Sequence, residues 1–189
     1  MANKDSAFGL RPIGKVGQNK DNQGLSEYSI AASATAIYQG DPVEMLATGT
    51  IGVAAAGDVL LGPLNGVFFT HASTSKPTFA NHLEASNTAT DIVGFVSDDP
   101  YERFEVQSNN TGASAQTDIG NVANIEYTAG SSPNYVSKVE LDDSDLATSD
   151  GQLKVIGVSK DPDNSDLSSA NVNFVVTINE HFLKQEAGI

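Results

Sequence analysis

The sequence of 189 residues contains no cysteine. Without cysteine neither a disulfide framework nor a thiolate metal site can form, so folding must rest on apolar burial and strand pairing. Long apolar runs are also missing. The best candidate, residues 51–69, is interrupted by Asp58, Pro63 and Asn65, whereas a membrane-spanning helix needs about 18 or more continuous apolar residues. The first residues lack the apolar run of a signal peptide, so we expect a soluble, unsecreted protein.

Positive charge is scarce and unevenly distributed. The chain has 10 Lys and Arg against 24 Asp and Glu, a formal net charge of -14. The first twenty residues hold Lys4, Arg11, Lys15 and Lys20 but only one acid, Asp5, and therefore carry +3 (4 − 1); the remaining 169 residues carry -17 (6 − 23). An acidic body argues against nucleic-acid binding, because phosphate contacts need a basic face. A basic N-terminal segment thus precedes an acidic body.

Helical periodicity is nearly absent, and the modest helix candidates are residues 79–86 and 180–188. Strand patterns dominate instead. The clearest is "VNFVVTIN", which places Val172, Phe174, Val176 and Ile178 on one face of a half-buried strand. Weaker runs occur at 27–31, 35–39, 42–46, 65–70, 91–97, 102–107, 124–128, 135–140 and 153–159. Polar turns such as "QGDP" and "SDDP" separate them.

These runs predict an all-β fold, a β-sandwich or β-barrel of about ten short strands with little helix. We expect one domain: residues 1–20 form an extended N-terminal arm and residues 21–189 form the β-rich body. The glycines of "LGPLNGVFF" are interpreted as permitting sharp corners of the sheet.

Signatures of catalysis and metal binding are missing. The three histidines, His71, His82 and His181, accompany no G-x-S-x-G elbow, P-loop or H-E-x-x-H sequence. Glu180 and His181 are interpreted as a solvated pair at a strand end. A pair of carboxylates for glycoside cleavage would meet only in the fold, and nothing in the sequence selects one. We therefore expect a protein that is not an enzyme, with no catalytic residues.

Two acidic stretches, residues 142–151 and 161–166, crowd oxygen ligands as calcium loops do. An EF-hand loop also needs Gly at its sixth and Glu at its twelfth position. Counted from Asp161, those positions hold Asp166 and Val172. We expect solvent-facing turns, no bound metal and no cofactor.

Several stretches together resemble one protein family. "FGLRPIGK", "YQGDPVEM", "GPLNGVFF", "GFVSDDPYERFEVQ", "LKVIGVSKDPDNS" and "NFVVTINEHFL" follow one another over nearly the whole chain. In this combination they are similar to small head structural proteins of tailed bacteriophages, and most of all to the decoration or cement proteins. The acidic segment 140–166 and the short C-terminal tail depart from the family pattern.

The resemblance implies a β-rich virion protein, often a homotrimer, that binds the outside of the capsid and clamps neighbouring subunits. Its partner would be the major capsid protein, and it would be made in the host cytoplasm, with no nucleic acid or membrane as partner. Two other interpretations stay open. One is a head-fibre or receptor-binding module in which Tyr101 or Tyr135 lines a sugar site, and the other is a cell-wall hydrolase.

The N-terminal arm is the expected capsid-docking element. Phe8, Leu10 and Ile13 would act as apolar anchors, Pro12 would stiffen the backbone, and Arg11 and Lys15 would meet carboxylates; such a peptide can add as a strand to the sheet edge of a neighbour. Twenty extended residues reach at most about 66 to 72 Å. The arm could also lie back on its own acidic subunit. The remaining alternative is a disordered segment or an internal strand of the domain.

Overall fold

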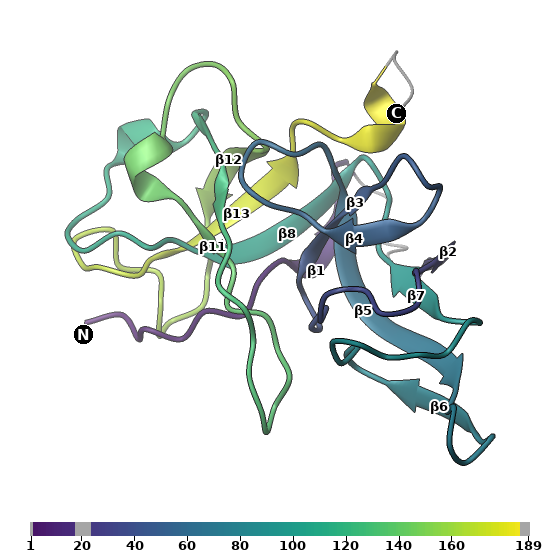
Figure 1. Ribbon diagram of the computed structural model, residues 1–189. Coiled ribbons are helices and arrows are strands. Elements are labelled where there is room, and N and C mark those ends of the chain that lie inside the picture. The colour runs from purple at the N-terminus through teal and green to yellow at the C-terminus, as the bar shows by residue number, and fades with distance from the viewer. Residues whose placement is uncertain (1, 18–23, 186–189) are drawn as a thin grey trace.

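The computed structural model describes residues 2–17 and 24–185 of the chain (Figure 1). Within these ranges the regular elements are thirteen strands and three short 3-10 helices, with no α-helix. The 3-10 helices are η1 (Gln116–Asp118), η2 (Asp143–Asp145) and η3 (Phe182–Lys184). The prediction of an all-β fold with little helix is confirmed. Lys20 and the end of the helix candidate 180–188 lie outside the described residues.

Two larger antiparallel sheets and one small one make up the fold. The first sheet has the order β1-β8-β13-β12-β9. Its strands are β1 (Arg11–Lys15), β8 (Glu102–Gln107), β13 (Asn173–Ile178), β12 (Leu153–Val158) and β9 (Val122–Ala123). The two-stranded sheet pairs β10 (Ile125–Glu126) with β11 (Glu140–Leu141).

The second large sheet has the order β2-β7-β5-β3-β4, with β6 paired to β5. Its strands are β2 (Ser26–Ser29), β7 (Val93–Val96), β5 (Leu60–Thr70), β3 (Pro42–Met45), β4 (Ile51–Val53) and β6 (Pro77–Ala80). Figure 1 shows the β5–β6 hairpin extending from the body at the lower right.

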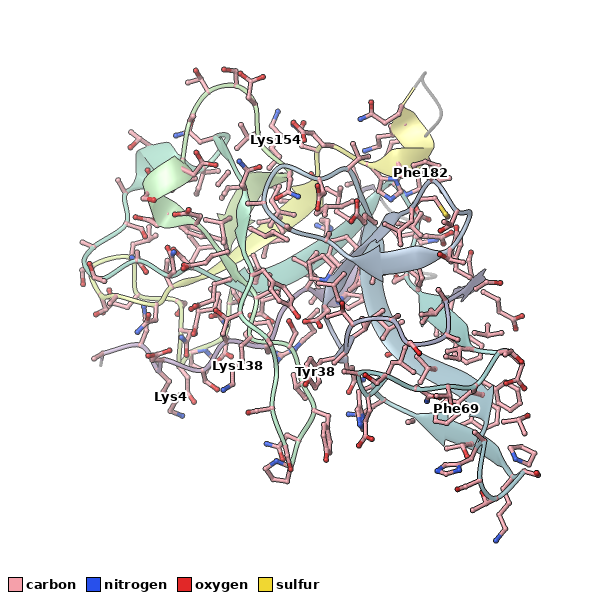
Figure 2. The ribbon with its side chains drawn as sticks, in the orientation of Figure 1. Lys4, Tyr38, Phe69, Lys138, Lys154 and Phe182 are labelled. Carbon is pink, nitrogen blue, oxygen red and sulfur yellow. The ribbon has the colours of Figure 1, made fainter. Side chains whose placement is uncertain are left out.

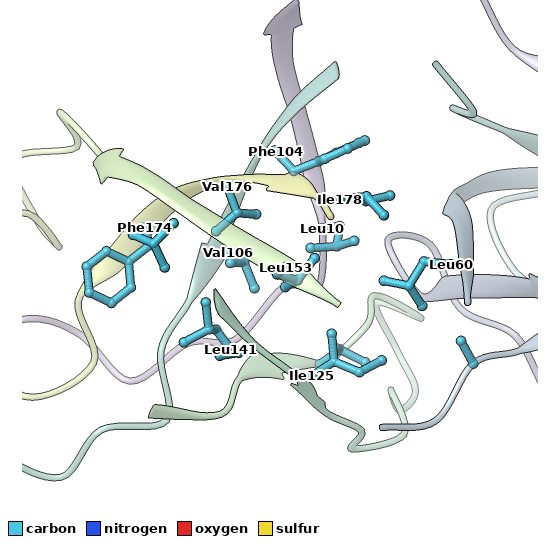
Figure 3. Close-up of a cluster of buried hydrophobic side chains, with 14 of the residues drawn as sticks. Leu10, Leu60, Phe104, Val106, Ile125, Leu141, Leu153, Phe174, Val176 and Ile178 are labelled. Carbon is cyan, nitrogen blue, oxygen red and sulfur yellow. The ribbon is translucent and has the colours of Figure 1, made fainter. Parts of the chain in front are cut away.

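Alternation within the strands explains the first core. On β13 the residues Phe174, Val176 and Ile178 face inward and are at most 1% exposed, while Val175 and Thr177 are only partly buried. They pack against apolar side chains from β8, β12 and β11, and Figure 3 shows Leu10 of the N-terminal segment within the same cluster. The expected inward face of the strand 172–178 is confirmed.

A second cluster of buried side chains forms under the other large sheet. It includes Ile37, Leu61, Leu64, Val67 and Val96, each at most 1% exposed. Gly62 stands in β5 with a φ of +152°, and a Cβ there would lie 2.0 Å from the carbonyl oxygen of Ser97. The register of β3 against β5 shifts beside this glycine. Only glycine permits this close backbone approach, so Gly62 is required at the irregular point of the β3–β5 pairing.

Several expectations about individual segments were wrong. Residues 135–139 form a turn and isolated bridges at Val136 before β11 begins at Glu140, so the predicted strand 135–140 does not form. In the described part of the helix candidate 180–188, the helix is the short η3. Residues 79–86 do not form a helix, because Pro77–Ala80 instead pairs with β5 as strand β6. Residues 35–39 form isolated bridges through Ile37 and Gln39 rather than a continuous strand. Within the described ranges, no helix is long and apolar enough to cross a membrane.

Candidate docking surface

The N-terminal segment, residues 2–17, lies against the body of its own chain. Gln107 accepts a hydrogen bond from the backbone N–H of Ser6 at 2.8 Å and donates its Nε2 to the carbonyl oxygen of Lys4 at 2.9 Å. The side chain of Asn164 binds the backbone of Lys4 in the same two-sided way. Amide side chains here replace the backbone of a neighbouring strand, because each offers both an NH2 donor group and a carbonyl acceptor.

Leu10 is anchored inside the first core. It is 1% exposed, and its backbone N–H donates to the carbonyl oxygen of Gly40 at 2.9 Å. The close approach depends on Gly9, whose φ is +74° and at which a Cβ would lie only 2.3 Å from the same Gly40 oxygen. A docking role for Leu10 would require this part of the chain to leave the core.

Strand β1 follows Leu10 and forms the edge of the first sheet, antiparallel to β8. The strand pairing expected with a neighbouring subunit is here made within the chain. The outer edge of β1 is interrupted, because Pro12 has no N–H and the register shifts between Pro12 and Gly14. Both features limit the addition of a further strand.

The side chains of β1 divide into paired and unpaired ones. Arg11 lies 3.3 Å from Glu105 and 4.0 Å from the centre of the Phe8 ring. Lys15 lies 2.6 Å from Asp99, and this contact, with the N–H of Tyr101, lowers the pKa of the Asp99 carboxyl. Ile13 is 44% exposed and Pro12 is also exposed, so these two apolar side chains remain accessible.

A surface groove with a volume of about 520 Å³ runs beside this strand. It is lined by the predicted docking residues Phe8, Leu10, Arg11 and Pro12, together with Leu25, Pro63 and Val136 from other parts of the chain. We call β1 and this groove the β1 face. Nothing in the sequence indicates that Leu25, Pro63 or Val136 would lie beside this segment, because only the folding of the two sheets brings them there.

A buried polar cluster lies at the turn between β7 and β8. Ser97 donates a hydrogen bond to Glu102, which is 2% exposed and whose pKa is raised chiefly by burial. His181 is fully buried and accepts a hydrogen bond from the N–H of Leu183 at 3.1 Å. Burial lowers the pKa of His181 to about 4. The expectation of a solvated Glu180–His181 pair was wrong for His181, because the chain beyond β13 folds its ring under the surface.

The other two histidines have local contacts. His71 accepts from Ser73 in the β5–β6 turn. His82 stacks on Tyr135 with the ring centres 3.8 Å apart and an angle of 2° between the rings. One face of Tyr135 is thus occupied, whereas Tyr101 is 63% exposed with the Lys184 Nζ 5.1 Å from its ring centre.

The acidic turns use their carboxylates locally. Asp142 accepts from both the N–H and the hydroxyl of Ser144, and Asp166 does the same for Ser168. Lys4 binds Asp163, and Figure 2 shows Lys4 at the lower rim of the molecule. Among residues 2–17 and 24–185, no group of three or more His, Asp or Glu side chains has an arrangement that could hold a metal ion.

Comparison with known proteins identifies no relative: no family model, no curated protein and no solved structure matches this chain.

Proposed function

We propose that this chain is a non-enzymatic structural protein of a phage head, which binds the outside of the assembled capsid through the β1 face. The partner is the major capsid protein, and the chain acts as a homotrimer. The proposal rests on the resemblance in the sequence and on one structural observation. Ile13, on the edge strand β1, is 44% exposed and lies on the segment that also lines the 520 Å³ groove.

Apolar contact rather than charge dominates this docking. Burying a large apolar side chain contributes roughly 1.5 to 3 kcal/mol, whereas an exposed ion pair contributes about 0 to 1 kcal/mol. Arg11 and Lys15 already contact carboxylates of their own chain. Added salt should therefore weaken capsid binding only modestly.

The test is co-sedimentation of the purified chain with capsid shells of the phage that encodes it. Ile13→Asp should reduce binding at least about tenfold, since it places a charge where an apolar side chain would be buried. Ile156→Asp is the matched control: Ile156 is 38% exposed and lies on β12 of the same sheet. Equal binding by the two variants would refute the β1 face, and failure of the unmodified chain to bind shells would refute the function.

The alternative is a glycan-binding head-fibre module. The exposed ring of Tyr101 favours it, because sugars stack on accessible aromatic faces and this ring is largely accessible. Binding of the chain to host surface glycans that is lost in Tyr101→Ala would support this alternative. Labelling of the chain on a protrusion rather than on the head lattice would support it too.

A further inference from the structure

The second sheet carries an apolar patch on the side away from its core. Strands β2, β7, β5 and β6 lie side by side there. Their inward residues, such as Val67, Phe69 and Val96, belong to the core, and Figure 2 labels Phe69 in this part of the molecule. Because side chains alternate along a strand, the outward positions form a separate face. Its apolar members are Phe68, Pro77, Phe79, Val93 and Phe95.

Three phenylalanines form the centre of this face, which we call the Phe face. Phe68 is directly opposite Phe79 across β5 and β6, with ring centres 4.8 Å apart, and the ring centres of Phe79 and Phe95 are 6.4 Å apart. Phe79 is 74% exposed, more than any other large apolar side chain among the described residues. An exposed aromatic cluster of this kind marks an interaction surface, because water contact with adjoining apolar rings is unfavourable.

Charge indicates which partner fits the Phe face. The chain carries -14 overall, so two copies repel each other over most of their surface. Residues 66–80, which form the β5–β6 hairpin, contain no acid and one base, Lys76. Within these residues a second copy meets no carboxylate; beside them Asp91 accepts a hydrogen bond from the N–H of Thr70.

The borders of the Phe face carry opposite charges. Glu27 lies on β2 opposite Phe95, and Lys76 precedes β6 at the other edge of the sheet. Neither forms an ion pair with any part of the chain that the structure describes. A neighbouring copy can therefore place its Lys76 against Glu27 while the aromatic rings meet. A head-to-tail contact of this type closes into a ring when the rotation is right.

We propose that the Phe face is the surface through which copies of this chain bind one another. This deepens the proposed function, on whose homotrimer it rests, by assigning self-association to a surface separate from the β1 face. Phe79 is the central contact, and the Glu27–Lys76 pair sets the orientation of the copies.

The test is the molar mass of the full chain in solution, measured by light scattering over a range of concentrations. Phe79→Ser should raise the dissociation constant of the oligomer at least about tenfold, the effect of losing a central aromatic contact. The substitution leaves the fold intact, because Phe79 is mostly in solvent. The matched control is Tyr101→Ser, which changes an aromatic ring that is 63% exposed and lies outside the Phe face, and it should leave the molar mass unchanged.

A charge exchange tests the orientation. Lys76→Glu alone should weaken the oligomer, and Glu27→Lys in the same chain should restore it. An unmodified chain that stays monomeric at about 100 µM, well above the micromolar dissociation constants of ordinary complexes, would overturn the proposal, and so would a Phe79→Ser variant that associates normally. Capsid co-sedimentation separates the two proposals, since a monomeric Phe79→Ser chain that still binds shells through its β1 face would uphold both.

Discussion

Substituting Leu10 tests whether the N-terminal segment is part of the fold. Leu10 is 1% exposed and packs with the first core, next to side chains of β8, β12 and β13. Replacing a buried leucine by alanine costs about 2 to 5 kcal/mol, because apolar contact is lost and a cavity remains. For a chain of this size, each kcal/mol lowers the melting temperature by about 2 to 4 °C. Leu10→Ala should thus lower it by roughly 4 to 20 °C.

The assay is thermal and urea unfolding followed by circular dichroism. Ile13→Ala is the control within the same segment: its side chain is 44% exposed, so its free energy of unfolding should change by no more than about 1 kcal/mol. A chain that begins at Asp21 loses Leu10 and strand β1 together and should be less stable than Leu10→Ala. If Leu10→Ala melts within about 1 °C of the unmodified chain, an effect far below that of a core cavity, the segment is a separable arm and its packing contributes nothing.

Two further predictions concern acid and metal. Burial lowers the pKa of His181 to about 4, so the unfolded chain binds more protons between about pH 6.5 and 4 and the free energy of unfolding falls as the pH drops through that window, by about 3 kcal/mol. Burial raises the pKa of Asp41 to about 6, so between about pH 6 and 3.8 the folded chain binds more protons at this group and the free energy of unfolding rises as the pH drops. In urea unfolding at several pH values, the free energy of unfolding should therefore fall more steeply with acid in Asp41→Asn and less steeply in His181→Asn. Parallel curves of this free energy against pH would contradict both assignments. Since Asp142 and Asp166 bind serines of their own turns, EDTA should leave the melting temperature unchanged, and a drop restored by calcium would reveal a bound ion.

Period-two patterns in the sequence predict the interior strands well. Residues 102–107 become β8, and β12 (Leu153–Val158) lies within the predicted run 153–159. On β12 Leu153 and Val155 are buried while Lys154 and Ile156 are exposed, whereas β8 buries five of its six residues, so only β12 shows the alternation. Alternation does not reveal strands β1, β4, β6 and β9. They are short or lie at sheet edges, and pairing with a neighbouring strand defines them instead.

The residues that make up the two candidate surfaces could be predicted from the sequence only where they are neighbours along the chain. Phe8, Arg11 and Pro12 are neighbours in sequence and could be selected together, whereas the groove beside them also needs Leu25, Pro63 and Val136 from distant segments. Phe68, Phe79 and Phe95 gather on the Phe face only because β6 pairs with β5 and β5 with β7. Long-range pairing of this kind has no local signal in one sequence. His181 illustrates the point for a single residue, since a histidine after a strand gives no sign that later residues will bury it.

The positive charges of the N-terminal segment are largely paired with negative charges in the body of the same chain. Lys4 contacts Asp163, Arg11 contacts Glu105 and Lys15 contacts Asp99, so each described base of the segment meets an acid of the body. A +3 segment beside a -17 body therefore predicts attachment of the segment to its own subunit as readily as to a neighbour. Pro12 and Ile13 make no such contact and are exposed, and Phe8 lines the groove beside them. The ion pairs of Arg11 and Lys15 thus help to hold β1 against its own subunit, and under the proposed function the exposed apolar side chains of β1 are the ones that would contact the capsid.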